Sequence, residues 1–149
     1  MNPQQVGRAG EMFVAAEIHR RGGYAVTFAG NMPGIDVLAS DLTDSRRVSI
    51  QVKTKSSGTW HARFPRDGLQ CTEDPAESSY WIFVDLGEEH PQYFIAPRWW
   101  VRNDIWADAS AYLAQYEAKH GHPRESEHHG INVRRVRQWR DRWDILGIF

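Results

Sequence analysis

Apolar side chains recur at helical spacing near the start of the chain. The apolar or small positions of residues 3–21 fall on one side of a helix: Val6, Gly10, Phe13, Val14 and Ile18. Two glycines at 22–23 follow this stretch, and glycine commonly ends a helix. The pattern predicts a helix with one apolar face.

A shorter periodicity, typical of β-strands, follows. Residues 47–54 alternate, with Val48, Ile50 and Val52 on one face and Ser49, Gln51 and Lys53 on the other. Residues 80–86 are almost entirely apolar and predict a buried strand. Shorter strands are predicted at 24–29, 35–40 and 92–96, with a hairpin-like connection at 41–45 and a turn at 87–91.

The remaining segments have weaker patterns. Residues 56–79 predict mostly loop with one short helix, and residues 120–130 predict a polar loop with surface histidines at 120, 122, 128 and 129. Residues 97–119 predict a helix, although 99–101 also suit a sheet edge. Residues 131–146 predict a last helix, with Val136, Trp139, Trp143 and Leu146 on one face. This order predicts one α/β domain over 1–149, with an N-terminal helix, a mixed central sheet flanked by helices, and a helical C-terminal part from about 97.

Composition narrows the class of protein. A chain of 149 residues with 41% hydrophobic and 25% charged residues suits a single globular domain. The single cysteine, Cys71, cannot form an internal disulfide or a Cys-rich zinc site, which favours a reducing, cytoplasmic compartment. We expect no membrane partner, because no apolar run approaches the roughly 20 residues of a membrane span. The seven tryptophans are read as core residues, with base stacking as the alternative.

The net charge of −1 conceals a segregated distribution. Residues 45–66 contain six bases and no acid, residues 129–149 contain five arginines and two aspartates, and residues 67–128 contain twelve acids and four bases. Clustered bases suit phosphate contacts, and the alternative is a solvated face that pairs with the acidic middle segment. The candidate nucleic-acid-binding residues are Arg46, Arg47, Lys55, Arg63, Arg134 and Arg137, and Arg66 belongs to the same basic block. The acidic middle segment also suits a protein partner.

Three polar side chains are predicted to converge near the basic block. Asp36 lies on one predicted strand, and Gln51 and Lys53 lie on one face of the next, separated by a rise of about 7 Å. A hairpin would bring this carboxylate, amide and ammonium together. Carboxylate and amide oxygens suit Mg²⁺, to which the Val52 carbonyl can add a further oxygen, while Lys53 can orient or activate a water.

These residues resemble a known family. The pattern GID…IQVKT, preceded by a helix that carries GRAGE, resembles the PD-(D/E)XK nuclease superfamily over residues 7 to about 55. It is most similar to the Holliday-junction-resolvase-like and type IV restriction-like branches, in which the middle acid of the D/E-x-K element is often Gln, giving a Q-x-K motif. The resemblance implies a restriction-endonuclease-like core and a DNA endonuclease that uses Mg²⁺ or Mn²⁺ and works as a homodimer.

Residue by residue, the resemblance implies a metal-binding role for Asp36, the D/E/Q position for Gln51 and the motif lysine for Lys53. It implies that the helix glutamate is Glu11, although Glu17 lies inside the apolar stripe and is the alternative. Because Gln51 carries no negative charge, the alternative function is a nuclease fold that no longer cuts. Such a protein would serve as a DNA-binding or protein-interaction module, for instance an immunity or regulatory partner.

Overall fold

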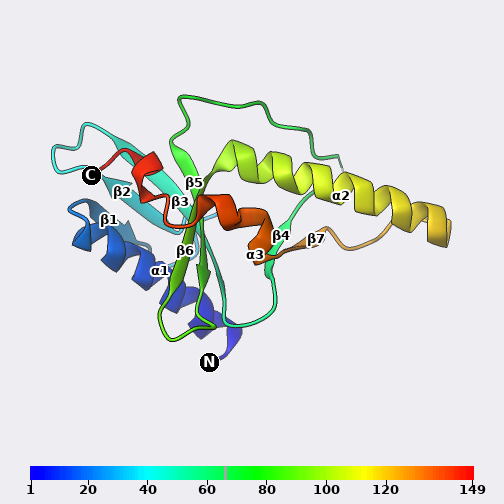
Figure 1. The fold of residues 1–149 in the computed structure, drawn as a ribbon, viewed down its shortest axis with the longest axis horizontal. Coiled ribbons are helices and arrows are strands. Elements are labelled where there is room, and N and C mark those ends of the chain that lie inside the picture. The colour runs from blue at the N-terminus through cyan, green and yellow to red at the C-terminus, as the bar shows by residue number, and fades with distance from the viewer. Residues whose placement is uncertain (66) are drawn as a thin grey trace.

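A five-stranded mixed sheet forms the centre of the computed structural model, which describes residues 1–65 and 67–149 (Figure 1). Its order is β1-β2-β3-β5-β6. Only the β3–β5 pair is parallel in this sheet, and the other neighbours are antiparallel. The strand bounds are β1 Tyr24–Thr27, β2 Val37–Ser40, β3 Arg47–Lys55, β5 Ser79–Asp85 and β6 Gln92–Pro97. The predicted α/β class, with an N-terminal helix and a mixed sheet, is confirmed.

Helix α1 (Pro3–Arg20) covers one face of the sheet. It begins with a capping box, in which Asn2 and Gln5 each bond the other's backbone N–H. Val14 and Ile18 pack against the even-numbered face of β3, including Val48 and Ile50, and form the first core cluster. The helix therefore covers the face of β3 opposite Gln51 and Lys53.

Helix α2 (Arg98–His120) and a second, two-stranded sheet lie on the other face. That sheet pairs β4 (Trp60–Arg63) with β7 (His128–Ile131). The second core cluster joins these elements, with Trp60 from β4, Phe83 from β5, and Val101 and Ile105 from α2. The C-terminal half of α2 projects away from the sheet (Figure 1).

Two predicted loops contain strands. Residues 60–63 form β4, which alternates buried and exposed side chains, within the segment predicted as loop with one short helix. Residues 128–131 form β7 within the predicted polar loop. His129 is consequently buried, with 6% of its surface exposed, so its prediction as a surface histidine was wrong. The two strands pair across more than 60 residues of sequence, a separation that local patterns do not reveal.

The predicted helix over 131–146 was also wrong. The segment forms α3 (Val133–Val136) and two short 3₁₀ helices, η1 (Arg137–Trp139) and η2 (Trp143–Leu146). Between these, the Asp141 N–H donates to the Tyr93 carbonyl at 3.0 Å, and the chain crosses the β6 edge. Val136 joins the second core cluster, whereas Trp143 and Leu146 join the first, on the opposite face of the sheet. One straight helix cannot reach both faces.

The tryptophans mostly pack in these cores, as in the first of their two interpretations. Trp60 and Trp143 are almost fully buried, and Trp100 packs against Trp139 with ring centroids 5.3 Å apart. Trp81 is half-buried beside a cavity described below. Within residues 1–65 and 67–149, no helix has the length and apolar character required to span a membrane.

Candidate functional site

Asp36 is held directly before β2 by a tight turn and two backbone contacts. The turn at Pro33 and Gly34 places Gly34 at φ +75°, a conformation that glycine adopts without steric cost. The Asp36 N–H donates to the Ile50 carbonyl at 2.9 Å, and its Oδ2 accepts from the Val52 N–H at 2.7 Å. The carboxylate is thereby fixed to the middle of β3.

The predicted hairpin between the two site strands is present. Val37, the first residue of β2, pairs with Ile50, so Asp36 precedes the ladder at the level of Gln51. Gln51 and Lys53 face away from α1, as the alternation predicted. The structure therefore brings Asp36, Gln51 and Lys53 to one region of the sheet.

The Val52 carbonyl lies at the open end of this hairpin. β2 pairs only with residues 47–50 of β3, so beyond Ile50 the β2 side of β3 has no strand neighbour. The N–H and C=O of one strand residue point to the same side, and the Val52 N–H points to Asp36. Its carbonyl therefore faces the side on which the carboxylate lies.

Lys53 has an unusual environment for a lysine. Its Nζ lies 5.4 Å from the centroid of the Trp81 ring, a cation–π distance. Burial lowers the pKa of Lys53 from its usual value, and the nearby Asp36 carboxylate opposes that shift by favouring the charged form. The amine is thus easier to deprotonate than an exposed lysine.

Glu11 reaches the site from α1. Gly10 makes this possible, because a Cβ there would lie 1.8 Å from Thr54 Oγ1, so glycine lets the helix approach β3 closely. Glu11 and Asp36 line one small cavity of about 150 Å³. Arg8 also lines it, pairs with Glu11 at 2.6 Å and donates to the Phe28 carbonyl at 2.9 Å.

Glu17, the alternative helix glutamate, is engaged elsewhere. It pairs with Arg20 at 2.7 Å and with Arg21 at 2.9 Å. The hydrogen bond from Arg20 is the largest influence on its pKa, and the combined contacts lower that pKa from its usual value. Geometry therefore favours Glu11 as the partner of Asp36.

The donors around Asp36 fit a hard divalent cation. Across the described residues, no group of three or more His, Cys, Asp or Glu side chains is arranged to hold a metal. Mg²⁺, however, commonly binds through one or two carboxylates and keeps several waters. Asp36 and Glu11 could supply the carboxylates, with the Gln51 amide oxygen and the Val52 carbonyl as further oxygen donors.

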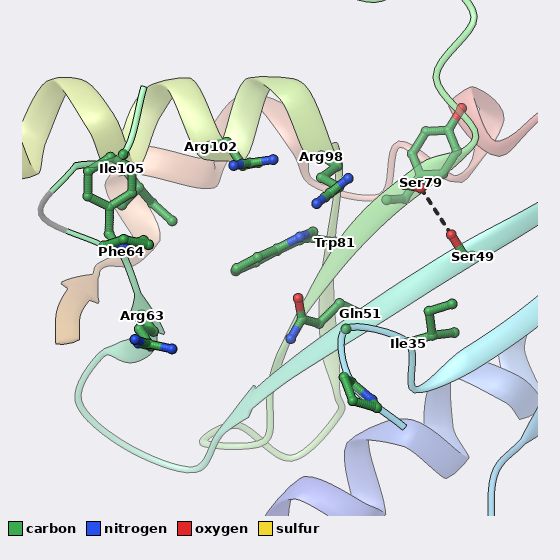
Figure 2. A pocket seen from close by; sticks show the side chains of 15 residues that line it. Ile35, Ser49, Gln51, Arg63, Phe64, Ser79, Trp81, Arg98, Arg102 and Ile105 are labelled. Atoms are coloured by element: carbon green, nitrogen blue, oxygen red, sulfur yellow. Dashed lines mark hydrogen bonds between the residues drawn. The ribbon is translucent and has the colours of Figure 1, made fainter. Parts of the chain in front are cut away.

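A second cavity, of about 370 Å³, opens beside Gln51 (Figure 2). We call it the arginine cavity, because Arg63 of β4 and Arg98 and Arg102 of α2 line it. Gln51, Trp81 and Phe64 also contribute to its wall, and the turn at 33–35 that leads to Asp36 borders it. Among the described residues that line this cavity, none is acidic.

The basic residues predicted near β3 have different environments. Arg46 donates to the Leu146 carbonyl at 2.7 Å, to the Glu77 carbonyl and to the Tyr80 hydroxyl, so it anchors the C-terminal segment. Lys55 is 9% exposed and pairs with Asp85 at 2.5 Å, which corrects its assignment to a DNA-facing surface. Arg47 is exposed and pairs with Asp44. Arg63 is exposed, pairs with Glu127 and lines the arginine cavity.

The remaining basic candidates lie elsewhere. Arg134 and Arg137 are exposed, on α3 and η1 respectively, and neither is among the residues that line the arginine cavity. Arg66 of the basic block lies outside the described residues. Of the predicted basic residues that the structure describes, only Arg63 therefore lines the arginine cavity.

No local pattern of the sequence singles out Arg98, Arg102 and Trp81 as members of a site. The two arginines stand four residues apart in the first turns of α2, a spacing that places them on one helix face. They were overlooked because residues 67–128 are acidic on average. Trp81 pairs with Gln51 in the parallel register of β3 and β5, and the two side chains face the same side of the sheet. Their proximity cannot be recognised without that register.

No protein-family model matches the chain, and no curated protein matches it at a significant level. Among solved structures, the fold is similar to that of I-Ssp6803I, a bacterial homing endonuclease, with a TM-score of 0.54. The two sequences are 11% identical, and the match covers 98% of this chain and 92% of the other. The chain therefore has the fold of a known nuclease over nearly its whole length.

Proposed function

We propose that this protein is a metal-dependent DNA endonuclease that hydrolyses phosphodiester bonds. The observation that carries the proposal is the placement of Asp36, Gln51 and Lys53 at one hairpin, with Glu11 lining a cavity shared with Asp36. A fold similar to a bacterial homing endonuclease supports DNA as the substrate. The proposal places the chain in the PD-(D/E)XK superfamily that its motif resembles.

Each residue of the site has a proposed role. Asp36 would bind Mg²⁺ or Mn²⁺, and the hydrogen bond from the Val52 N–H to its Oδ2 would hold the carboxylate in one orientation. Gln51 and the Val52 carbonyl complete the protein ligands. Glu11 binds a second ion or positions the first through water.

Lys53 is proposed to act on the attacking water. Burial lowers its pKa, so a larger fraction of its amine is neutral, and able to accept a proton from that water, than in an exposed lysine. The bound metal would supply Lewis-acid activation of the water and stabilise negative charge on the phosphate. Trp81 limits the movement of the amine by packing beside it.

One observation favours a catalytically silent alternative. Arg8 pairs with Glu11, and Lys53 lies near Asp36, so both carboxylates have a cationic neighbour without any metal. Gln51 adds no further negative charge. A site with balanced charge suits a DNA-binding or protein-interaction module, such as an immunity or regulatory partner.

Cleavage of supercoiled plasmid in Mg²⁺ separates the two functions. We expect the wild-type protein to nick or linearise the plasmid, and Asp36→Ala and Lys53→Ala to lose this activity. Mg²⁺ should also raise the melting temperature of the wild-type protein, since a ligand that binds the folded state stabilises it. Equal cleavage by all three proteins would exclude these residues from the chemistry, and absence of both cleavage and stabilisation would favour the silent module.

Assembly and location follow as further proposals. Cutting both strands of a duplex requires two sites, so we propose that the protein acts as a homodimer in the cytoplasm. The acidic middle segment remains the proposed surface for any protein partner. Sedimentation of the protein with and without DNA tests the oligomeric state.

A further inference from the structure

The arginine cavity has positive charge that the described part of the protein does not neutralise. Arg98 and Arg102 stand at i and i+4 on α2, where like charges repel. Both are exposed, and neither forms an ion pair with a residue in 1–65 or 67–149. Arg63 of β4 contributes a third guanidinium across the cavity in Figure 2, and this one is already paired with Glu127. An anion in the cavity would relieve this repulsion.

The other lining groups indicate what kind of anion fits. The half-buried Trp81 indole lies between the arginines and Gln51 in Figure 2, and Phe64 and Ile105 add apolar surface. Gln51 presents an amide, which can both donate and accept hydrogen bonds. Aromatic surface for stacking, a polar amide and guanidinium groups together match a base attached to a phosphate.

The volume of the arginine cavity indicates whether a whole duplex or one nucleotide can enter it. A volume of about 370 Å³ is near the lower end of the range for small-molecule pockets, roughly 300–1,000 Å³. A double helix is far too large to enter, whereas one nucleotide outside the stack is of suitable size. Gln51 lines the cavity and belongs to the candidate metal site, so a nucleotide held there lies beside the proposed cutting position.

We propose that the arginine cavity binds one unpaired nucleotide of the DNA substrate. Its base packs against Trp81, and its phosphate pairs with Arg98 and Arg102. The inference rests on the proposed endonuclease function and specifies the substrate class, which is DNA with an unpaired nucleotide next to the cut. The free-energy cost of binding such a base is lowest where the base is already unpaired, because the duplex does not have to be opened.

Three DNAs of otherwise identical sequence test the proposal. The first is a perfect duplex, the second has one extra unpaired nucleotide, and the third has an abasic sugar-phosphate at that unpaired position. Binding is measured by fluorescence anisotropy in EDTA, so that no DNA is cut. We expect the wild-type protein to bind the second DNA about tenfold more tightly than the third, which keeps the phosphate but lacks the base, because this is the size of one stacking contact. The preference for the second DNA over the perfect duplex should be at least as large.

Variants of the cavity residues test whether the preference for an unpaired nucleotide arises in the arginine cavity. Arg102→Gln and Trp81→Leu should each reduce the preference of the protein for the second DNA to less than about threefold. Lys119→Gln is the matched control, since it removes one exposed positive charge from the far end of the same helix. It should retain the full preference. Arg102 is exposed, so its variant is expected to fold even if Trp81→Leu does not.

Several outcomes would overturn the inference. Equal wild-type affinity for all three DNAs shows that the cavity does not read an unpaired nucleotide. Equal affinity for the second and third shows that it does not read the base, and a preference that persists in Arg102→Gln places recognition elsewhere. Plasmid cleavage is scored separately. If the protein prefers the DNA with an unpaired nucleotide but does not cleave plasmid DNA, only the proposed endonuclease function is contradicted. If it cleaves plasmid DNA but shows no such preference, only the inference about the arginine cavity is contradicted.

Discussion

The Asp36 carboxylate accepts a hydrogen bond from the Val52 backbone N–H at 2.7 Å, where β2 has not yet begun to pair with β3. A side chain thus takes the place that a strand carbonyl would otherwise occupy. The contact satisfies a half-buried N–H and holds one carboxylate oxygen, which leaves Oδ1 for other ligands. The same carboxylate therefore has a structural and a proposed chemical role, and the two roles can be separated.

Asp36→Asn should separate them. Its amide oxygen can still accept from the Val52 N–H, so the free energy of unfolding should change little, whereas cleavage should be lost with the negative charge. Asp36→Ala should lose cleavage and also about 1–2 kcal/mol of stability, because the N–H loses its partner. Urea unfolding and plasmid cleavage measure the two effects. Full activity of Asp36→Asn would contradict the metal-binding role.

Lys53 should make stability depend on pH in a definite direction. Because burial lowers its folded-state pKa, the unfolded chain holds more protons between that pKa and the usual lysine value, so stability rises with pH there. Lys53→Met removes the buried charge and should be more stable than wild type at pH 7. Its advantage should shrink as the pH approaches about 10.

The same variant should be inactive. Loss of a group that transfers protons typically reduces rates by about 10²–10⁴-fold. Lys53→Arg keeps the charge but cannot release a proton at these pH values, and we expect it to be inactive as well. Denaturation curves from pH 7 to 10 together with cleavage rates check both effects. A stability difference that grows with pH would contradict the burial argument.

Glu11 and Glu17 should respond differently to the same change. Glu11→Gln should reduce cleavage by about 10–100-fold, as expected for a residue that orients a metal or its water. Glu17→Gln is the matched control on the same helix, and it should leave cleavage unchanged. The measurement is the initial rate of plasmid nicking in Mg²⁺. The opposite result would identify Glu17 as the helix carboxylate.

Glu17→Gln should instead alter the pH dependence of stability. Because the folded-state pKa of Glu17 is lowered, chiefly by Arg20, its contribution is present above the usual glutamate pKa and is lost as the pH falls below it. The variant should therefore differ from wild type at neutral pH and converge with it in acid. Thermal unfolding at pH 7 and pH 3 tests this expectation.

Two glycines of α1 should show opposite effects on stability. Gly10→Ala would place a Cβ 1.8 Å from Thr54 Oγ1, so the helix must shift, at a cost of about 1–3 kcal/mol. Gly7→Ala meets no atom within 4 Å and should stabilise the helix by about 0.4–1 kcal/mol. Gly10→Ala should also slow cleavage, because Glu11 moves with the helix. A neutral Gly10→Ala would show that α1 does not depend on this close approach.

Local periodicity was sufficient for the elements that build the main sheet. The helix at the N-terminus and the alternation of residues 47–54 depend only on residues within a few positions of each other, and the structure confirms both. The short connection at 41–45 made the pairing of the strands around it predictable. The hairpin that places Asp36 beside the strand of Gln51 and Lys53 was therefore predictable from the sequence, whereas the roles of these three residues stay predictions.

Contacts between residues far apart in the sequence determined the second sheet, the C-terminal segment and the burial of Lys55. The strand β4 alternates the buried Trp60 and Ala62 with the exposed His61 and Arg63 and could have been recognised, but its partner β7 lies far along the chain. Residues 131–146 have a helical pattern, yet Val136 and Trp143 belong to cores on opposite faces, so the chain must bend around β6. Burial likewise removed Lys55 from the surface by pairing it with Asp85.

The sequence by itself determined the helix, the strands of the main sheet and the face shared by Gln51 and Lys53, because these follow from repeats of two and 3.6 residues. Only the tertiary structure showed that Glu11 lines a cavity together with Asp36 and that β4, β5 and α2 form the arginine cavity. The physical reason is that these groups meet across large sequence separations. Their contacts depend on how closely the helices pack against the sheet, which no local pattern of the chain encodes.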